Sequence, residues 1–346
     1  MKDRHMTSRA RWVGAVALGA SLASAAYAGP LEDFYKGNKV TMYIGSEVGA
    51  GYDLYGRTVA RHIGKHIPGN PSVVPVNMPG AGSIILANFM YSKAEKNGTA
   101  IAGIQNGDVI EPLVGNTNAR YKPEEFDWLG SVNQQTNVCI SWATTGVKSA
   151  ADVQSKEFLL GVVSSTSTET VANLLNELTG TKFKLIKGYS STGAVLKAME
   201  QGEVGGLCGI GIDSVQSSMT DALRNHRINV FIQVGSEKHP EIPEATFVYD
   251  ILKNPADKPL LDFLVGRMLF GRPFLQPAGV PEDRAKALRD AFWATMHDPE
   301  FLAEAKKVNM PVMPIDGKTA SEAVKKLVDA PPDLIARATK VLGSAK

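Results

Sequence analysis

The sequence predicts an α/β protein of two lobes, each a mostly parallel sheet flanked by helices, with a hinge between them. Short apolar runs that read as buried strands alternate with helical patterns along most of the chain. Several of these runs end in loops rich in glycine or hydroxyl residues that open a helix. With 346 residues, 44% of them hydrophobic, the chain is long enough for two separate cores.

Residues 1–28 have the pattern of an export signal. A positive start is followed by an apolar stretch from Trp12 to Ala25 and by a small-x-small site, Ala26-Tyr27-Ala28. The four basic residues of the start are Lys2, Arg4, Arg9 and Arg11. We expect cleavage after Ala28 and an exported protein; the alternative is that the apolar stretch stays as an N-terminal anchor.

The overall charge argues against nucleic acid as a partner. Four of the 37 basic residues and one of the 35 acidic residues lie in residues 1–28, which leaves the rest of the chain at about −1. No basic stripe interleaved with aromatic residues is present. The six histidines show no HxxH spacing and the cysteines no CxxC spacing, so we expect no metal. The run VGGLCGIGI has no GxGxxG at a strand-to-helix junction, so we expect no cofactor.

The first unit, VTMYIGSEVGAGYDLYGR, predicts a strand over Val40–Ile44, a glycine loop and a helix from about Asp53. The free N–H groups of such a loop and the positive end of the helix favour an anion, although a plain βα turn would have the same pattern. Asp53 is placed to be the N-cap. Apolar residues at a four-residue spacing from Tyr55 to Ile67 should face a sheet.

The next units of the predicted first lobe have the same order of strand, glycine loop and helix. A strand over residues 72–76 leads into Asn77-Met78-Pro79-Gly80-Ala81-Gly82-Ser83, which opens a helix over residues 84–94. A third strand follows at 100–105. In parallel sheets ligands bind beyond the carboxyl ends of the strands, where both glycine loops should lie.

The extended segment Trp128–Trp142 is predicted to cross into a second lobe, with the boundary near Cys139. There a strand at 158–163 precedes five hydroxyl residues, 164–168, which either cap a helix and donate to a ligand or form a solvated turn. The remaining predicted strands are 183–187, 204–212 and 228–234, and the helices are 169–178, 194–201 and 217–225.

The C-terminal part is predicted to return to the first lobe. Residues 239–259 contain four prolines and should be irregular, and residues 260–274 make the return. Helices are predicted over 281–296, 301–308 and 319–327. The expected organisation is a leader, 1–28; lobe 1, 29–138 plus 263–346; and lobe 2, 139–262.

Cys139 and Cys208 are the only cysteines. An oxidising compartment would allow a disulfide, but both lie in apolar surroundings, and we favour two buried thiols.

Five segments occur in an order that resembles the Bug/TctC family, the extracytoplasmic solute receptors of tripartite tricarboxylate transporters. They are the opening loop, the segment Val76–Gly82, the turn Asn97-Gly98-Thr99, the segment Gly202-Glu203-Val204 and the ending Gln276-Pro277-Ala278-Gly279-Val280-Pro281. The likeness covers residues 40–327, most of the chain after the leader.

This resemblance implies a type II-like periplasmic binding protein that closes on a small organic carboxylate and docks to a membrane permease. It implies ligand contacts, by position, from Ser46, Glu47, Gly49, Gly51, Tyr52, Asp53, Gly80, Ala81, Gly82, Ser164, Ser165, Thr166, Ser167, Tyr189, Ser190 and Thr192. The expected ligand is a dicarboxylate or an aromatic acid, and we expect a monomer.

The chain departs from the family pattern at Ala50, Tyr52 and Glu47. A carboxylate at position 47 should disfavour a ligand of many negative charges, such as citrate, unless it points away. Tyr52, Tyr189 and Trp142 either line a flatter pocket for an aromatic or longer aliphatic acid or simply pack.

We expect no enzyme activity. A secreted hydrolase with a serine from residues 164–167 is the contrasting hypothesis, but Val162-Val163-Ser164-Ser165 is no GxSxG elbow, and His226 and His239 have no special setting. A third hypothesis keeps the receptor and replaces the permease by a signalling partner.

Overall fold

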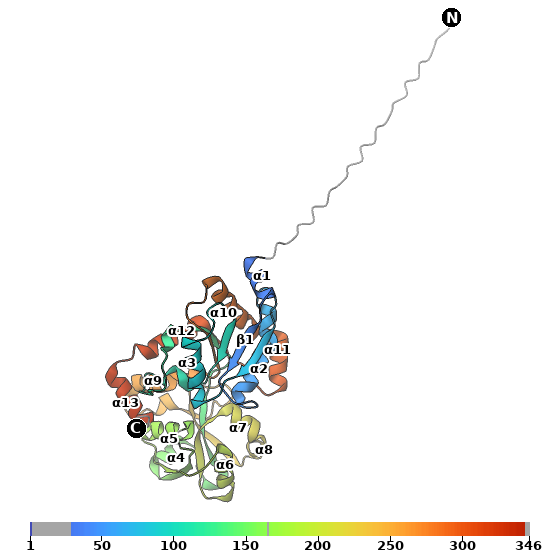
Figure 1. The fold of residues 1–346 in the computed structure, drawn as a ribbon. Coiled ribbons are helices and arrows are strands. Elements are labelled where there is room, and N and C mark those ends of the chain that lie inside the picture. Colours follow the sequence, from blue (N-terminus) through green and yellow to red (C-terminus); the bar gives the residue numbers. More distant parts are fainter. Residues whose placement is uncertain (2–28, 165, 343–346) are drawn as a thin grey trace.

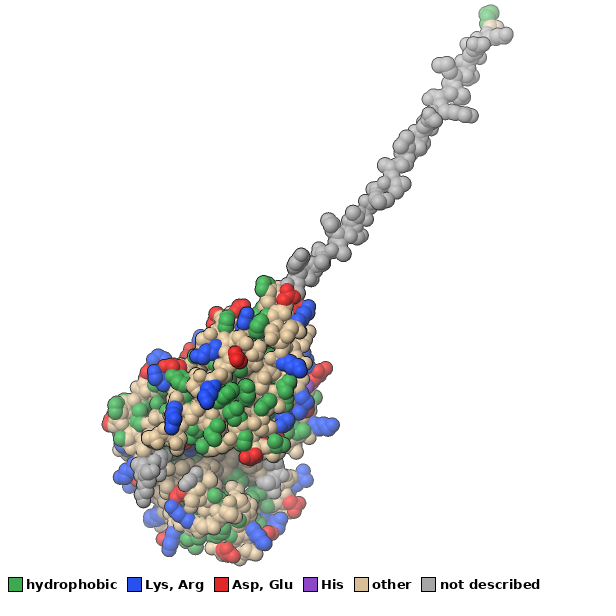
Figure 2. All heavy atoms as spheres, viewed as in Figure 1, with side chains coloured by type: hydrophobic (Ala, Val, Ile, Leu, Met, Phe, Trp, Pro, Cys, Tyr) green, Lys and Arg blue, Asp and Glu red, His purple; other side chains and the backbone are tan. Residues whose placement is uncertain are grey.

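The computed structural model describes Met1, residues 29–164 and residues 166–342. The predicted leader, apart from Met1, and Ser165 therefore lie outside the described residues. Figure 1 shows two lobes stacked on one another, and the space-filling view in Figure 2 shows a waist between them.

The strands are β1 (Val40–Ile44), β2 (Val73–Asn77), β3 (Ala100–Gly103), β4 (Asp127–Ser131), β5 (Asn137–Trp142), β6 (Phe158–Gly161), β7 (Phe183–Ile186), β8 (Gly206–Gly211), β9 (Ile228–Val234), β10 (Thr246–Phe247), β11 (Pro273–Gln276) and β12 (Ile315–Asp316). The α-helices are α1 (Pro30–Lys36), α2 (Gly51–Ile63), α3 (Ile84–Ser92), α4 (Ala150–Ser155), α5 (Ser167–Thr179), α6 (Thr192–Gln201), α7 (Ile212–Ser218), α8 (Thr220–Arg224), α9 (Lys258–Gly266), α10 (Glu282–Met296), α11 (Pro299–Lys307), α12 (Gly317–Val328) and α13 (Pro332–Leu342).

Within the described residues, each lobe contains one mixed sheet of six strands. The upper sheet has the order β12-β4-β11-β3-β1-β2, and the lower has β10-β9-β5-β8-β6-β7. The βα units make parallel pairs, such as β1 with β2 and β3. The strands that carry the chain between lobes run antiparallel to their neighbours: β11 with β3 and β4, and β5 with β8 and β9. The two-lobed α/β architecture is confirmed, with more antiparallel pairing than the sequence suggested.

The predicted crossing segment is two strands in two different sheets. Its first part is β4 in the upper sheet, its second part is β5 in the lower sheet, and residues 132–136 join them. The chain returns to the upper sheet at β11. Strand 228–234 matches β9, whereas the predicted helix 217–225 is two short helices, α7 and α8, the first of which starts at Ile212.

The predicted apolar stripe, which runs from α2 through the 3-10 turn after it to Ile67, is buried. Tyr55, Val59, Ile63 and Ile67 are at most 4% exposed and belong to one core with Phe292 of α10 and Phe301 of α11. The C-terminal helices α10 and α11 thus cover the same face as α2, as Figure 1 shows. The terminal helix α13, which the sequence analysis missed, packs against α9 and against α5.

Cys139 and Cys208 form a disulfide, so the prediction of two free thiols is wrong. They are directly paired residues on the neighbouring antiparallel strands β5 and β8, with Cα atoms 4.0 Å apart. Both side chains are fully buried. The sequence could not show this pairing, because the two cysteines are 69 positions apart, and three α-helices and two other strands lie between them.

The outer edge of the upper sheet is apolar. Val74 and Val76 of the edge strand β2 are about two-fifths exposed, and Ile85 of α3 is half exposed. Figure 2 shows hydrophobic side chains gathered on the upper lobe. Pro75 has no N–H to offer a further strand, which protects the edge from added pairing.

Within the described residues, no helix is long and apolar enough to span a bilayer.

Candidate functional site

The two predicted glycine loops of the upper lobe lie against one another at the ends of β1 and β2. A Cβ atom at Gly45 would lie 2.3 Å from the Cβ of Ser83, closer than real Cβ atoms approach. Glycine at position 45 therefore allows the two loops to touch. The predicted residues Ser46 to Asp53 and Gly80 to Gly82 thus share one edge of the sheet.

Helix α2 begins at Gly51 with Ala50 as its N-cap, so the prediction that Asp53 is the N-cap is wrong. The Asp53 carboxylate instead accepts hydrogen bonds from the Gly49 N–H, the Arg57 Nε and the Asn77 Nδ2, each at 2.8 Å. Burial by itself would raise the pKa of Asp53, but these bonds outweigh it and lower the pKa. The carboxylate therefore fixes the shape of the loop from inside.

The rest of the first loop leaves the start of α2 open. Gly49 has a φ of 83°, which suits glycine, and Glu47 and Gly51 are exposed. Ser46 is 6% exposed, and its Oγ has no hydrogen-bond partner among the described residues. The first N–H groups of a helix have no acceptor within the helix and carry partial positive charge, so this end of α2 can bind an anion.

The second loop is held in a rare backbone conformation. Gly80, Ala81, Gly82 and Ser83 all have positive φ, at 131°, 47°, 65° and 74°. Left-handed conformations at Ala81 and Ser83 are unfavourable unless the surroundings hold them. The Ser83 Oγ donates to the buried carboxyl of Asp108 and accepts from a backbone N–H at 2.8 Å. Burial raises the pKa of Asp108 well above its usual value.

Tyr52 faces a cation that the sequence analysis missed. The Arg272 guanidinium lies over the Tyr52 ring at 4.4 Å and over the Tyr55 ring at 4.8 Å. The Tyr52 hydroxyl accepts from the Asn106 N–H at 3.2 Å. A Cβ at Gly51 would lie 3.7 Å from Arg272 Nη2. An arginine and the positive end of α2 therefore lie side by side.

The hydroxyl loop of the lower lobe is largely engaged with its own backbone. Thr166 is the N-cap of α5 and donates to the Val163 carbonyl at 2.8 Å. The Ser167 Oγ donates to the Gly209 carbonyl, also at 2.8 Å. Ser164 is exposed. The predicted capping role of this loop is confirmed.

The other predicted residues of the lower lobe lie around the start of α6. Thr192 is its first residue, Ser190 is exposed, and Tyr189 packs against the lower core. Trp142 ends β5 at the side away from the crossing segment and stacks with Arg227, so it packs outside the cleft.

Arg267 connects the two lobes. It lies in the return segment, and its Nη2 donates to the Thr170 Oγ1 of α5 at 3.4 Å. Burial lowers the pKa of Arg267, while the charge of Glu111 and the hydroxyl of Tyr52 act in the opposite direction. A second cation of the return segment therefore contacts the helix that follows the hydroxyl loop.

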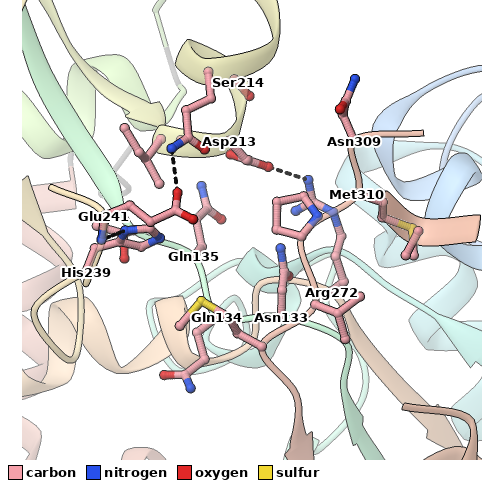
Figure 3. Close-up of a pocket in the computed structure, with 18 of the residues that line it drawn as sticks. Asn133, Gln134, Gln135, Asp213, Ser214, His239, Glu241, Arg272, Asn309 and Met310 are labelled. Carbon is pink, nitrogen blue, oxygen red and sulfur yellow. Dashed lines mark hydrogen bonds and ion pairs between the residues drawn. The ribbon is translucent and has the colours of Figure 1, made fainter. Parts of the chain in front are cut away.

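A cavity of about 890 Å³ opens beside Arg272, between the lobes. Its walls come from the crossing segment at 133–136, from the start of α7 and from the stretch 309–313 after α11. Figure 3 shows Asp213 of α7 and Arg272 pointing toward each other across it, and their closest atoms are 3.9 Å apart. None of the predicted contact residues lines this cavity; Arg272, which touches Tyr52, joins it to the predicted loops.

Among the described residues, one group of side chains has the spacing of a metal site: His62, Asp298 and Glu300. Lys65 already pairs with both carboxylates, and His62 bonds to Glu304. These groups hold α2 to α11 as an ion-pair network.

No protein-family model matches the chain, and no curated protein matches it. Several solved structures are similar to the chain. A TctC solute-binding protein from Polaromonas has 15% sequence identity and a TM-score of 0.67 over 88% of this chain and 98% of its own. Rpa4515 of R. palustris, solved with adipate, has 16% identity and a TM-score of 0.60 over 87% and 97%. The periplasmic binding protein BugD has 18% identity and a TM-score of 0.58 over 88% and 97%.

These similarities show that the chain has the fold of two-lobed periplasmic solute-binding proteins. Within that class, its fold is that of the TctC and Bug proteins, which confirms at the level of the fold the resemblance found in the sequence.

The sequence held a signal for the two arginines that were missed. Residues 260–274, LLDFLVGRMLFGRPF, are mostly apolar, and Arg267 and Arg272 are the only cations in them. Charges in a buried segment need partners or a ligand. Only the fold reveals that this segment brings Arg272 against the Tyr52 ring.

Proposed function

We propose that this chain is an extracytoplasmic solute receptor of the Bug/TctC type, which captures a small organic carboxylate between its lobes. The observation that carries the proposal is the pairing of two positive groups: the open end of α2 lies next to the Arg272 guanidinium, and Arg272 also lines the cavity between the lobes. The fold it shares with a protein solved with adipate supports an organic acid as ligand.

The ligand is held from both lobes. The first-lobe contacts are the N–H groups at the start of α2 and the loop Gly80–Gly82, with Tyr52 and Arg272 beside them. The second-lobe contacts come from the loops before α5 and α6. Exposed Glu47 lies in the loop before α2, next to the proposed first-lobe contacts, and its negative charge disfavours ligands of high negative charge. The lobes, 29–138 plus 263–346 and 139–262, close by a hinge at the crossing segment.

Export and delivery complete the proposal. Residues 1–28 direct export and are removed after Ala28, the mature monomer works in the periplasm, and the closed form docks to a tripartite tricarboxylate-type permease. N-terminal sequencing of the exported protein tests the cleavage site. Pull-down with the permease subunits, with and without ligand, tests delivery.

Thermal-shift screening tests the binding function. The mature protein is screened against mono-, di- and tricarboxylates and aromatic acids, and at least one acid should raise the midpoint in a concentration-dependent way. Glu47→Gln should improve binding of the more highly charged acids if that carboxylate faces the ligand. A flat response across the whole panel would contradict the receptor proposal.

A sensor that passes the same ligand signal to a signalling protein is the alternative, and the pull-down separates the two partners. We infer no catalysis, because the hydroxyls of Thr166 and Ser167 donate to backbone carbonyls and no histidine hydrogen-bonds to them within the described residues. Hydrolase assays on the mature protein with ester and amide substrates should therefore give no turnover.

A further inference from the structure

We propose that Arg272 selects for ligands that carry a carboxylate, and that Asp213 pairs with the Arg272 guanidinium when no ligand is bound. On binding, the ligand's carboxylate replaces that of Asp213. The inference rests on the proposed receptor function and adds to it the identity of the charge that the ligand must satisfy. It also assigns a role to an ion pair that links the two lobes.

The backbone of Arg272 is firmly held in the upper lobe. Its N–H donates to the Ser131 Oγ at 3.0 Å, and its carbonyl accepts from the Val132 N–H at 3.0 Å. The side chain is stacked on two tyrosine rings, which restrict its motion. Arg272 is thus a preorganised cation at the base of the cleft.

The guanidinium is short of acceptors. Nη1 donates to the Gly271 carbonyl at 2.7 Å, and the buried Nε has no partner among the described residues. Nη2 lies 3.9 Å from the nearest Asp213 oxygen, which is beyond hydrogen-bond distance. An arginine can bind a carboxylate through two parallel hydrogen bonds, and here that geometry is not used. A ligand carboxylate can therefore make bonds that Asp213 does not.

Asp213 lies in the first turn of α7 in the lower lobe, and its side chain is 27% exposed. An ion pair at this distance and exposure contributes little to stability, so it is readily exchanged. Because the partners belong to opposite lobes, exchange changes the contact between the lobes as well as the charge in the cleft. Asp213 therefore competes with the ligand and also tethers the lobes in its absence.

The space beside the pair suits a small acid. The cavity of about 890 Å³ is within the usual range for small-molecule sites. Neutral amides line it next to the ion pair, among them Gln135 and Asn309, which Figure 3 shows around Asp213 and Arg272. These groups can bind the uncharged part of the ligand, while Arg272 binds the carboxylate.

Two measurements test the proposal, with matched charge controls outside the cavity. Arg120 is exposed and does not line the cavity, so Arg120→Gln controls for the loss of one positive charge, and exposed Asp221 of α8, also outside the cavity lining, does the same for Asp213. For the acid that gives the largest thermal shift, calorimetry should show an affinity loss of about 10- to 100-fold in Arg272→Gln. Asp213→Asn should bind about 3- to 10-fold more tightly, and Arg120→Gln and Asp221→Asn should bind as the wild type does. Wild-type affinity in Arg272→Gln or in Asp213→Asn would overturn the proposal.

The second measurement needs no ligand. Fluorescence energy transfer between labels on the two lobes should report a larger mean separation in Arg272→Gln and Asp213→Asn than in the wild type, with the two control variants unchanged. Far-UV circular dichroism verifies that each variant is folded, and Arg272→Lys keeps the charge if the glutamine variant does not fold. Unchanged separation in both variants would contradict the tether. If no acid binds the wild type, the proposed receptor function is wrong. This measurement still decides whether the pair of Asp213 and Arg272 holds the two lobes together.

Discussion

The disulfide between Cys139 and Cys208 should provide a large part of the stability of the protein. It links strands β5 and β8 across a sequence separation of 69 residues. Removing a crosslink over a loop of that length restores chain entropy to the unfolded state worth about 4 kcal/mol in the loop-closure model. A typical domain has only about 5–15 kcal/mol of stability in total, so the effect should be easy to measure.

Urea unfolding of wild type and of Cys139→Ala/Cys208→Ala, each with and without a reductant, measures this contribution. Reductant should lower the wild-type midpoint toward that of the double variant and leave the double variant unchanged, which separates the crosslink from the loss of buried sulfur atoms. Thiol titration of the denatured, unreduced protein should find no free thiol. Two free thiols, or a midpoint that does not respond to reductant, would refute the reasoning.

Three further predictions concern the site and its support. Gly51→Ala should leave ligand affinity nearly unchanged, because only Arg272 Nη2 lies within 4 Å of the added Cβ. Gly51→Val should weaken binding strongly, because the larger side chain covers the start of α2. Calorimetry measures both affinities, and equal affinities in the two variants would contradict the anion site. Because the pKa of Asp108 is raised, wild-type stability should fall as the pH rises above about 4. Asp108→Asn should therefore be more stable than the wild type in urea unfolding at pH 7, and a less stable variant would contradict this. For Asp298, burial opposes ionisation, but bonds from Lys65 and His66 hold the pKa of the carboxyl well below its usual value. Its contribution to stability is therefore present above about pH 4 and is lost as the pH falls below that value. The difference in stability between the wild type and Asp298→Asn should disappear at acid pH, and a difference that does not change with pH would contradict the ion pairs.

The sequence alone determined the local pattern of this protein. Strand β1, strand β9 and the buried stripe of α2 follow directly from the periodicity of apolar residues, because that period decides which face a segment can bury. The glycine loop was predictable for the same kind of reason: glycine permits backbone shapes that other residues avoid.

Only the tertiary structure decided how these segments meet. Three contacts join residues that are tens or hundreds of positions apart: Cys139 pairs with Cys208, Gly45 approaches Ser83, and Arg272 stacks over Tyr52. Sequence periodicity reports which face of a segment is buried but carries no information on which distant segment covers that face. Strand order and the direction of the crossing strands supply that information, and so they set the charge of the cleft.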